Sequence, residues 1–303
     1  MKNTDMDLIQ LNKKFQTQDQ CIAYLEEVRW AGKVKCVYCE SSRITKLKNS
    51  FRHHCNGCNR SFSVFVGTIF EGTKVSLIKW FTAICLITNA KKGISSRQLA
   101  RDIKVNKDTA WYMQMRVRSA MKDDHDNFLD GIIEADETYV GGAMKNKKLT
   151  ERNSKYQDVI TGMNHKIPLL GIYQRQGKII VKTIYKADGK HIKPVLKKLL
   201  SKNAELVTDG FGGYSGLDKV FKKHVILYHS KNQHRKGNYH TNTIEGFWSM
   251  LKRSIIGQYH KVSQEHIQSY VDELSFKYNY RNQNVFNTLI IRSVNNTLPF
   301  DGT

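Results

Sequence analysis

Hydrophobic positions recur with the period of an α-helix through most of the first 120 residues. Residues 17–30 predict an amphipathic helix that begins with a capping box. Residues 75–91 are apolar on nearly all sides, which indicates a buried helix. Two short amphipathic helices follow at residues 96–103 and 107–120, with a tight turn between them. This part of the chain is therefore predicted to be mainly helical, apart from a cysteine-bearing segment that ends near residue 70.

From residue 130 the periodicity becomes that of β-strands. The stretch "GIIEADETYV" alternates as a strand does, and residues 168–187 predict a hairpin that turns at Gln176 and Gly177. The later segments read as the helix "HIKPVLKKLL", the strands "AELVTDG" and "KHVILYH", the helix "NTIEGFWSMLKR" and a last helix over residues 264–281. The order strand, strand, strand, helix, strand, helix, strand, helix is that of a ribonuclease H-like fold. We therefore predict an α/β class with a mixed sheet and flanking helices.

The charge of the chain narrows the class of partner. Its 49 Lys and Arg residues exceed its 27 Asp and Glu residues, which gives a net charge of +22. This excess favours a polyanion, because neutralising phosphates releases their counterions; the alternative is a basic protein with no nucleic-acid role. No apolar run approaches the ~18 residues of a membrane span, and the start has no secretory-signal pattern. We expect a cytoplasmic protein with no membrane partner.

Four of the six cysteines form two close pairs. Two residues separate the members of each pair and 15 residues separate the pairs, which comprise Cys36, Cys39, Cys55 and Cys58. This spacing is that of a four-thiolate zinc site, because each two-residue gap forms a knuckle that points both sulfurs at one ion. The site is closed, so the predicted role of Zn²⁺ is structural.

Two features of this predicted zinc ribbon leave alternatives open. His53 and His54 lie beside the second cysteine pair and are possible substitute ligands. A glycine often follows such a knuckle, because the backbone there is left-handed. Here Glu40 and Asn59 take those positions, and Asn tolerates that conformation better than Glu does. The geometry of the first knuckle is therefore the less certain of the two.

The two short helices of residues 96–120 match a helix-turn-helix in length and pattern. Their apolar positions face inward, and the second helix leaves polar and basic side chains for the major groove of DNA. The residues predicted to contact DNA are Lys107, Thr109, Gln114, Arg116 and Arg118. A purely structural helical pair is the alternative.

These patterns divide the chain into three parts. Residues 1–72 are predicted to form an N-terminal helix and zinc ribbon, and residues 73–124 a helical, helix-turn-helix-like DNA-binding segment. Residues 125–303 are predicted to form a ribonuclease H-like domain. The main boundary lies in "KDDHDNFL", an acidic polar stretch in a basic chain.

Three carboxylates occupy places that converge at one end of the sheet in a ribonuclease H-like fold. Asp136 lies in the first strand of this domain, Asp209 ends the strand "AELVTDG", and Glu245 begins a helix. Three such acids can hold two Mg²⁺ or Mn²⁺ ions, which prefer oxygen ligands and catalyse in-line displacement at phosphorus. Lys252 follows Glu245 by seven residues on the same helix face, where it can reach a DNA phosphate or remain a solvated cation.

Each assignment has a simpler alternative. Asp209 precedes a glycine and is a typical turn former. Glu134 is a rival ligand because it lies two residues before Asp136, on the same strand face. Glu137 points to the other face, where we expect it to be solvated. Asn242, one turn before Glu245, is either a helix cap or a further ligand.

These stretches carry a family resemblance over roughly residues 17–285. The chain resembles insertion-sequence DDE transposases that join an N-terminal zinc ribbon to an ISXO-type transposase domain. The matching stretches are "CIAYLEEVRWAGKVKCVYC", "CNGCNRSFSVFVGTIFE", "GIIEADETYVGG", "VTDGFGGY", "HTNTIEGFWSMLKRSIIGQYHKVS" and "YVDELSFKYNYRN". The resemblance assigns catalysis to Asp136, Asp209 and Glu245, with Lys252 as the associated basic residue. The third position varies in this family and is sometimes Asn, so Asn242 is the alternative to Glu245.

The resemblance implies a bacterial, nucleoid-associated enzyme that binds terminal inverted repeats and target DNA. It implies metal-dependent strand cleavage followed by strand transfer, and we expect a homo-oligomer on DNA because two ends must be held together. Phe247 and Trp248 are candidates for stacking on terminal bases or for core packing. The rival functions are a zinc-ribbon DNA-binding regulator without catalysis and a ribonuclease H-like structure-selective nuclease.

Overall fold

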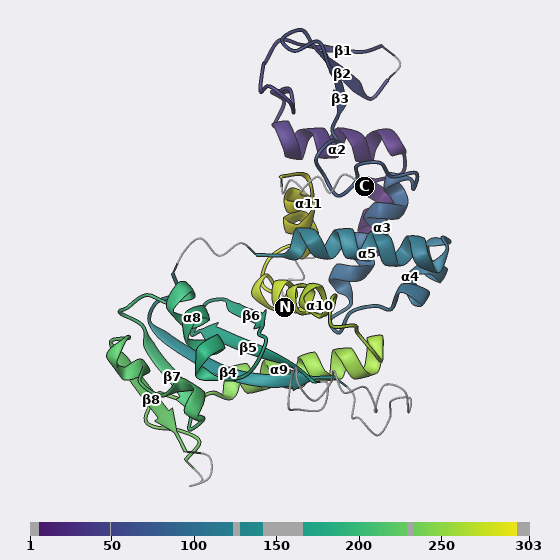
Figure 1. The fold of residues 1–303 in the computed structure, drawn as a ribbon. Helices are drawn as coiled ribbons and strands as arrows, with labels where there is room; N and C mark the ends of the chain where they lie inside the picture. Colours follow the sequence, from purple (N-terminus) through teal and green to yellow (C-terminus); the bar gives the residue numbers. More distant parts are fainter. Residues whose placement is uncertain (1–5, 49, 124–127, 142–165, 229–232, 296–303) are drawn as a thin grey trace, which may run out of the picture. The chain divides into compact units, whose positions relative to one another are not determined.

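The structure is a computed structural model that describes residues 6–48, 50–123, 128–141, 166–228 and 233–295. The chain forms two compact units (Figure 1). The first unit comprises Met1–Lys122 together with Tyr280–Thr303, and the second comprises Asp123–Asn279. None of the described helices combines the length and the apolar character that crossing a membrane requires.

The first unit is built mainly from helices whose apolar faces pack together. They are α1 (Leu8–Lys14), α2 (Gln18–Trp30), α3 (Leu77–Asn89), α4 (Ser96–Ile103), α5 (Lys107–Met121) and α11 (Val285–Asn295). The predicted capping box begins α2, because Thr17 accepts a hydrogen bond from the Gln20 backbone N–H and the Gln20 side chain accepts one in return. Helix α3 is buried on most sides, as its apolar sequence predicts.

Helix α11 belongs to the first unit, whereas the predicted division placed it in the catalytic domain. The Phe286 ring of α11 lies 6.0 Å from the Phe81 ring of α3. The Tyr24 hydroxyl of α2 donates a hydrogen bond to Asn287 at 3.1 Å. The apolar face of α11 therefore completes the helical core, although more than 160 residues separate it from the other helices of that unit.

Three short antiparallel strands form a small separate sheet in the first unit. They are β1 (Ile44–Lys46), β2 (Arg52–Cys55) and β3 (Ser61–Ser63), with β2 in the middle. Phe62 and two cysteines form the buried centre beside this sheet. So small a core cannot support a fold alone, which is why the cysteine site matters for its stability.

The second unit is a five-stranded mixed sheet with helices on both faces. Its strands are β4 (Ile132–Val140), β5 (Ile167–Gln174), β6 (Ile179–Thr183), β7 (Glu205–Asp209) and β8 (Lys223–Leu227). The order is β6-β5-β4-β7-β8. β4 pairs antiparallel with β5 and parallel with β7, so it lies at the centre of the sheet. The predicted hairpin turn joins β5 to β6 at Gln176 and Gly177.

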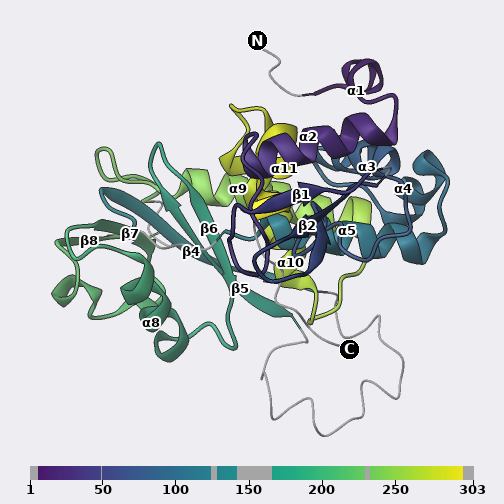
Figure 2. The same ribbon diagram turned by 90° about the horizontal axis from the view of Figure 1, so that it is seen from above.

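Alternate residues of β4 point to two different cores. Ile133 and Ala135 pack with α8 (Gly189–Leu199) on one face. The other face packs against α9 (Asn242–Ser254) and α10 (Ile267–Asn279), and α9 lies on the opposite side of the sheet from α8 in Figure 2. The apolar side chains buried there include Phe247 and Trp248 of α9. Three antiparallel strands continued by two parallel ones, with helices on both faces, form a ribonuclease H-like arrangement, and the predicted fold class is confirmed.

Two segments of the second unit depart from the regular strands and α-helices that were predicted. Only two 3₁₀ turns, Gly212–Tyr214 and Leu217–Lys219, lie between β7 and β8. Helix α9 continues into a π-helical turn, Ile255–Tyr259. The first departure follows from the loop sequence "GFGGYSGL", whose glycines disfavour a regular helix.

Candidate active site and zinc ribbon

Asp136 lies on the central strand, opposite a glycine on the neighbouring strand. Its partner on β5 is Gly171. A methyl group at Gly171 would lie 2.6 Å from the Ile244 side chain and closer still to the Trp248 ring, so only glycine leaves room for α9 to approach the sheet here. The indole N–H of Trp248 consequently reaches Asp136 and donates a hydrogen bond to its carboxylate at 2.9 Å. Trp248 is 4 % exposed, so it packs in the core as one of its two interpretations predicted.

Asp209 ends β7 at the level of Asp136. The parallel register pairs Glu134 of β4 with Val207 of β7. Asp136 lies two residues after Glu134, and Asp209 lies two residues after Val207. Asp209 also accepts the backbone N–H of Phe211 at 3.0 Å, so it forms the turn that its sequence context predicted. The turn and the site are compatible, because a carboxylate has lone pairs to spare.

Glu245 lies in the first turn of α9 and is exposed to solvent. Its carboxylate accepts a hydrogen bond from the Thr241 hydroxyl at 2.7 Å. Asn242, the alternative third ligand, is the first residue of the helix and is also exposed. Lys252 is exposed in the last turn of the same helix. The helix thus carries both candidates for the third ligand and the basic residue on its solvent-accessible side.

The three acids are close enough to influence one another electrostatically. The pKa of Asp136 rises from its ordinary 3.8 to about 6, chiefly because the carboxyl is buried. The negative charges of Asp209 and Glu245 raise this pKa further, while the hydrogen bond from Trp248 opposes the rise. Asp136 therefore retains a proton more readily than an ordinary aspartate, and a nearby cation would remove that tendency.

This electrostatic arrangement fits divalent cations. Asp136, Asp209 and Glu245 offer the oxygen ligands that hard cations prefer. A bound cation would also neutralise the negative charges of Asp209 and Glu245 that act on Asp136. Among the residues that the structure describes, the four cysteines are the one group whose ligand atoms all lie within 4.8 Å of one another. The three carboxylates are thus not arranged as the ligands of one shared ion. Two cations held about 3.5–4 Å apart need a wider set of ligands than one ion does.

The carboxylate oxygens of Glu134, the rival ligand, already accept several hydrogen bonds from the protein. Its side chain is completely buried and forms an ion pair with Arg175 at 3.0 Å. It also accepts the backbone N–H groups of Thr243 and Ile244 at 3.1 and 3.2 Å. A carboxylate that receives these donors holds the start of α9 and has little capacity left for a cation.

Glu137 points to the opposite face of the sheet, as predicted, but it is not solvated there. It is partly buried and accepts a hydrogen bond from the Tyr214 hydroxyl at 2.6 Å. Burial raises its pKa to about 7, and the charges of Asp209 and Asp136 add to the rise. The expectation of a solvated side chain was wrong because the loop after β7 folds Tyr214 over this face.

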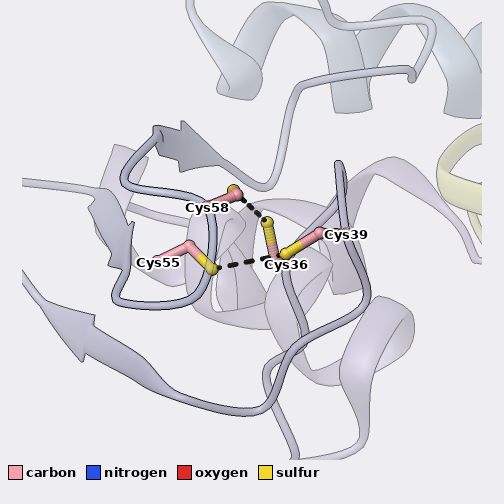
Figure 3. A group of neighbouring side chains, drawn as sticks. All are labelled: Cys36, Cys39, Cys55 and Cys58. Atoms are coloured by element: carbon pink, nitrogen blue, oxygen red, sulfur yellow. Dashed lines mark hydrogen bonds between the residues drawn. The ribbon is translucent and has the colours of Figure 1, made fainter.

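The four cysteines meet in the arrangement that tetrahedral zinc requires (Figure 3). The Sγ atoms of Cys36 and Cys58 lie 3.6 Å apart, as do those of Cys39 and Cys55. Zinc–sulfur bonds of about 2.3 Å in a tetrahedron put the sulfurs roughly 3.8 Å apart, whereas a disulfide needs about 2.05 Å. The cysteines therefore fit a structural Zn²⁺ ion.

Both knuckles have the same backbone conformation. Glu40 and Asn59 both have left-handed backbones, with φ of 56° and 57°, so Glu40 does not spoil the first knuckle. Backbone N–H groups donate to the Sγ atoms of Cys36 and Cys55. The alternative ligand His53 is used elsewhere, since its ring lies 2.9 Å from the carboxylate of Glu26. His54 contacts the Ser61 hydroxyl.

The helical pair forms where it was predicted, but two of its five proposed DNA contacts point inward. Gln114 is 2 % exposed and donates to the Ile94 backbone carbonyl, and Arg118 is also 2 % exposed. Neither can meet DNA from these positions, so those two assignments are corrected. Arg116 is partly buried and donates to the Thr68 carbonyl at 3.1 Å.

The exposed side of α5 carries other side chains. Lys107 is exposed and Thr109 is partly buried at its first turn. Trp111 and Tyr112 are 38 % and 44 % exposed. The predicted DNA contacts did not include these two aromatics. Their positions one and two residues after the inward-facing Ala110 place them on the outer side of the helix.

Comparison with known proteins agrees with this architecture. Residues 128–279 match the model of the ISXO2-like transposase domain, and residues 16–61 match that of the transposase zinc-ribbon domain. The chain belongs to the ISXO2-like transposase family. It is 27% identical, over 270 residues, to an uncharacterized protein in the transposable element ISH50 of Halobacterium salinarum. That match covers 86% of this chain and 90% of the relative.

Two solved structures also resemble this transposase at low similarity. A pre-cleavage Mos1 transpososome matches with a TM-score of 0.26 and 10% identity, covering 73% of this chain and 80% of that one. The Mos1 strand transfer complex matches with a TM-score of 0.28 and 12% identity, covering 73% and 79%. The assignment to the family depends on the sequence match and not on these structures.

Proposed function

We propose that this transposase cleaves DNA at the ends of an insertion sequence and joins them to target DNA at a two-metal site. The proposal is carried by the placement of Asp136 and Asp209 at the same level of adjacent strands, where burial raises the pKa of Asp136 and the charges of Asp209 and Glu245 add to the rise. Burying one carboxylate beside two others is a cost to folding. A binding function alone gives no reason to retain it.

The reaction has two displacements at phosphorus. Water attacks the phosphodiester at the element end, the bond from phosphorus to the 3′-oxygen breaks, and a 3′-hydroxyl and a 5′-phosphate remain. That hydroxyl then attacks a target phosphodiester, and the target's 3′-oxygen leaves. Two Mg²⁺ or Mn²⁺ ions, when bound, supply the activation of the attacking oxygen and stabilise the leaving oxygen.

The residues have distinct roles in this proposal. Asp136 and Asp209 supply oxygen ligands from adjacent strands, and Glu245 supplies them from α9. Trp248 orients Asp136 through its indole N–H. Lys252 is placed two turns beyond Glu245, where its ammonium can contact a DNA phosphate. No covalent protein–DNA intermediate is formed, so no serine or tyrosine nucleophile is required.

DNA binding is proposed for the helical pair of the first unit. The exposed Lys107 provides a phosphate contact, and the exposed aromatics Trp111 and Tyr112 provide surfaces that can pack against sugar or base. Thr109 and Arg116 remain candidates from the sequence, with Arg116 restricted by its hydrogen bond to the Thr68 carbonyl. Assembly of a homo-oligomer on two DNA ends is part of the same proposal.

The decisive experiment is an in vitro cleavage and joining assay. Purified wild-type protein is incubated with Mg²⁺ and duplexes that carry the two ends of the DNA flanking this reading frame. Asp136→Asn and Asp209→Asn should abolish both steps while DNA binding in a gel-shift assay persists. Asp218→Asn is the matched control, because it removes an exposed acid of the same unit from a 3₁₀ turn.

The same assay separates the rival functions and the third ligand. Binding of the ends without cleavage by the wild type would favour a regulator, and cleavage of branched DNA without joining would favour a structure-selective nuclease. Glu245→Gln and Asn242→Ala are compared directly, and the variant with the larger loss of cleavage identifies the third ligand. Activity that survives loss of either aspartate would overturn the proposed chemistry.

A further inference from the structure

Glu134 is a fully buried carboxylate that serves neither the metal site nor the surface. It lies two residues before Asp136 on β4 and has no solvent-exposed side-chain area. One of its oxygens accepts from the Arg175 guanidinium at 3.0 Å and from the Thr243 hydroxyl at 3.2 Å. The other accepts the backbone N–H groups of Thr243 and Ile244. Burying a charge in this way is costly unless such partners compensate for it.

The start of α9 depends on this carboxylate because it lacks a local cap. Thr241 occupies the N-cap position, but its side chain makes no capping hydrogen bond and instead donates to Glu245. The first backbone N–H groups of a helix have no partner within the helix. Glu134 accepts two of them from more than 100 residues away, and its negative charge also favours the positive end of the helix dipole.

Arg175 holds the segment that leads into the same helix. Its own backbone N–H donates to the Ile132 carbonyl of β4 at 2.9 Å, which anchors it to the sheet. Its guanidinium donates to the backbone carbonyls of Asn238 and His240 as well as to Glu134. The planar group therefore links the central strand to the chain that enters α9, a role that a lysine cannot reproduce.

We propose that Glu134 and Arg175 are positioning residues that set where Glu245 lies relative to Asp136. Glu245 directly follows Ile244, whose backbone Glu134 holds, and Asp136 follows Glu134 by two residues on the same strand. The contact between Glu134 and the first turn of α9 thus contributes to the distance between the two acids, together with the packing of Trp248 against Gly171 and Asp136. This inference rests on the proposed metal-dependent cleavage, but the contact itself can be tested without DNA.

The test uses Glu134→Gln in the full chain, with three measurements. The amide of glutamine would place N–H donors where α9 also presents N–H donors. Hydrogen exchange of the peptide covering residues 241–248 should become at least about tenfold faster. Binding of Mn²⁺ alone, counted from the electron paramagnetic resonance signal of the free ion, should weaken by roughly 10–100-fold, as should end cleavage. Gel-shift affinity for the ends should not change.

Asp188→Asn is the matched control. Asp188 also caps a helix of this unit, because it accepts the His191 backbone N–H at 3.0 Å, but that helix carries none of the three acids. We expect wild-type Mn²⁺ binding, cleavage and exchange of residues 241–248 from this variant. Arg175→Lys is the milder second variant, to be used if Glu134→Gln does not fold, and it should show the same changes to a smaller degree.

The outcomes distinguish this inference from the proposed function. Wild-type exchange of residues 241–248 in a folded Glu134→Gln protein would overturn it, as would faster exchange with unchanged Mn²⁺ binding. If neither the glutamine variant nor Arg175→Lys alters the metal site, the pair is structural only. Absence of cleavage by the wild type, with the exchange and Mn²⁺ changes present, would instead reject the cleavage reaction and leave the positioning role intact.

Discussion

Replacing Asp136 with asparagine should make the metal-free protein more stable while abolishing catalysis. Asparagine has nearly the same shape, and its carbonyl oxygen can still accept the indole N–H of Trp248. What it removes is a negative charge that burial and two neighbouring acids oppose. An active-site substitution that increases stability is unusual, since most substitutions destabilise, so the result is informative.

The magnitude follows from the pKa. The pKa of Asp136 rises from 3.8 to about 6 in the folded protein. One pKa unit is worth about 1.36 kcal/mol, so the ionised side chain costs the folded state ~3 kcal/mol at high pH. The sign follows because the folded state binds the proton more tightly. The cost is absent below about pH 3.8, grows as pH rises through about 6, and is constant above about pH 7.

The assay is urea denaturation of both proteins in the presence of a chelator, at pH values between about 4 and 8. The free energy of unfolding of Asp136→Asn should exceed that of the wild type by ~3 kcal/mol at pH 8 and by less than about 1 kcal/mol at pH 4. Asp188→Asn is the control of opposite sign, because the hydrogen bond with His191 lowers the pKa of Asp188 and its ionised form stabilises the fold.

Two results would refute this reasoning. If Asp136→Asn were less stable than the wild type at pH 8, the site would not impose an electrostatic cost. If the difference between the proteins did not depend on pH, its origin would not be the ionisation of Asp136. Addition of Mg²⁺ provides a further check, since a bound cation should stabilise the wild type by mass action and leave the asparagine variant nearly unchanged.

Four further predictions concern other parts of the chain. Cys39→Ser should lose zinc by elemental analysis and unfold the ribbon, whereas Cys21→Ser, which lies outside the cluster, should keep one zinc per chain. Gly171→Ala should destabilise the second unit by about 1–3 kcal/mol in urea denaturation, because the added methyl collides with α9; wild-type stability would contradict this contact. Lys107→Ala should weaken DNA binding equally for all sequences and reduce the salt slope by about one, while Gln114→Ala should lower stability because it leaves the Ile94 carbonyl unpaired. Unchanged affinity of the lysine variant would remove this residue from the DNA interface.

The sequence predicts local features of this transposase well. Cysteine spacing identifies the four residues whose sulfurs the fold brings together, since the two-residue gap restricts where both sulfurs can point. The capping box at Thr17 and the bounds of the helical pair depend on nearby residues and are confirmed. The identity of the inward-facing polar residues is harder to predict. Gln114 and Arg118 look like surface residues, and their burial depends on backbone carbonyls and packing that the sequence pattern does not reveal.

Helix α11 illustrates the same limit over a longer range. The last predicted helix ended at residue 281, so α11 itself was missed, and an apolar pattern does not say which core receives it. Sequence proximity favours the second unit, whereas Phe286 contacts Phe81 in the first. Apolar burial is not directional, so the choice between two available cores is decided by shape and chain geometry.

The contrast between Glu134 and Asp136 shows why one strand face can hold two carboxylates with different roles. The sequence presents them as equivalent, two residues apart with the same orientation. Glu134 receives a guanidinium, a hydroxyl and two helix N–H groups, so its charge is compensated within the protein. Within the described residues, the donors to Asp136 are uncharged, namely the Trp248 indole and a backbone N–H, and the charges of two other acids act on it. This difference in partners is why we propose Asp136, and not Glu134, as the cation ligand. The two carboxylates differ because α9 and Arg175 donate hydrogen bonds to Glu134. These donors lie far from Glu134 in the sequence, so they can be identified only once the fold is known.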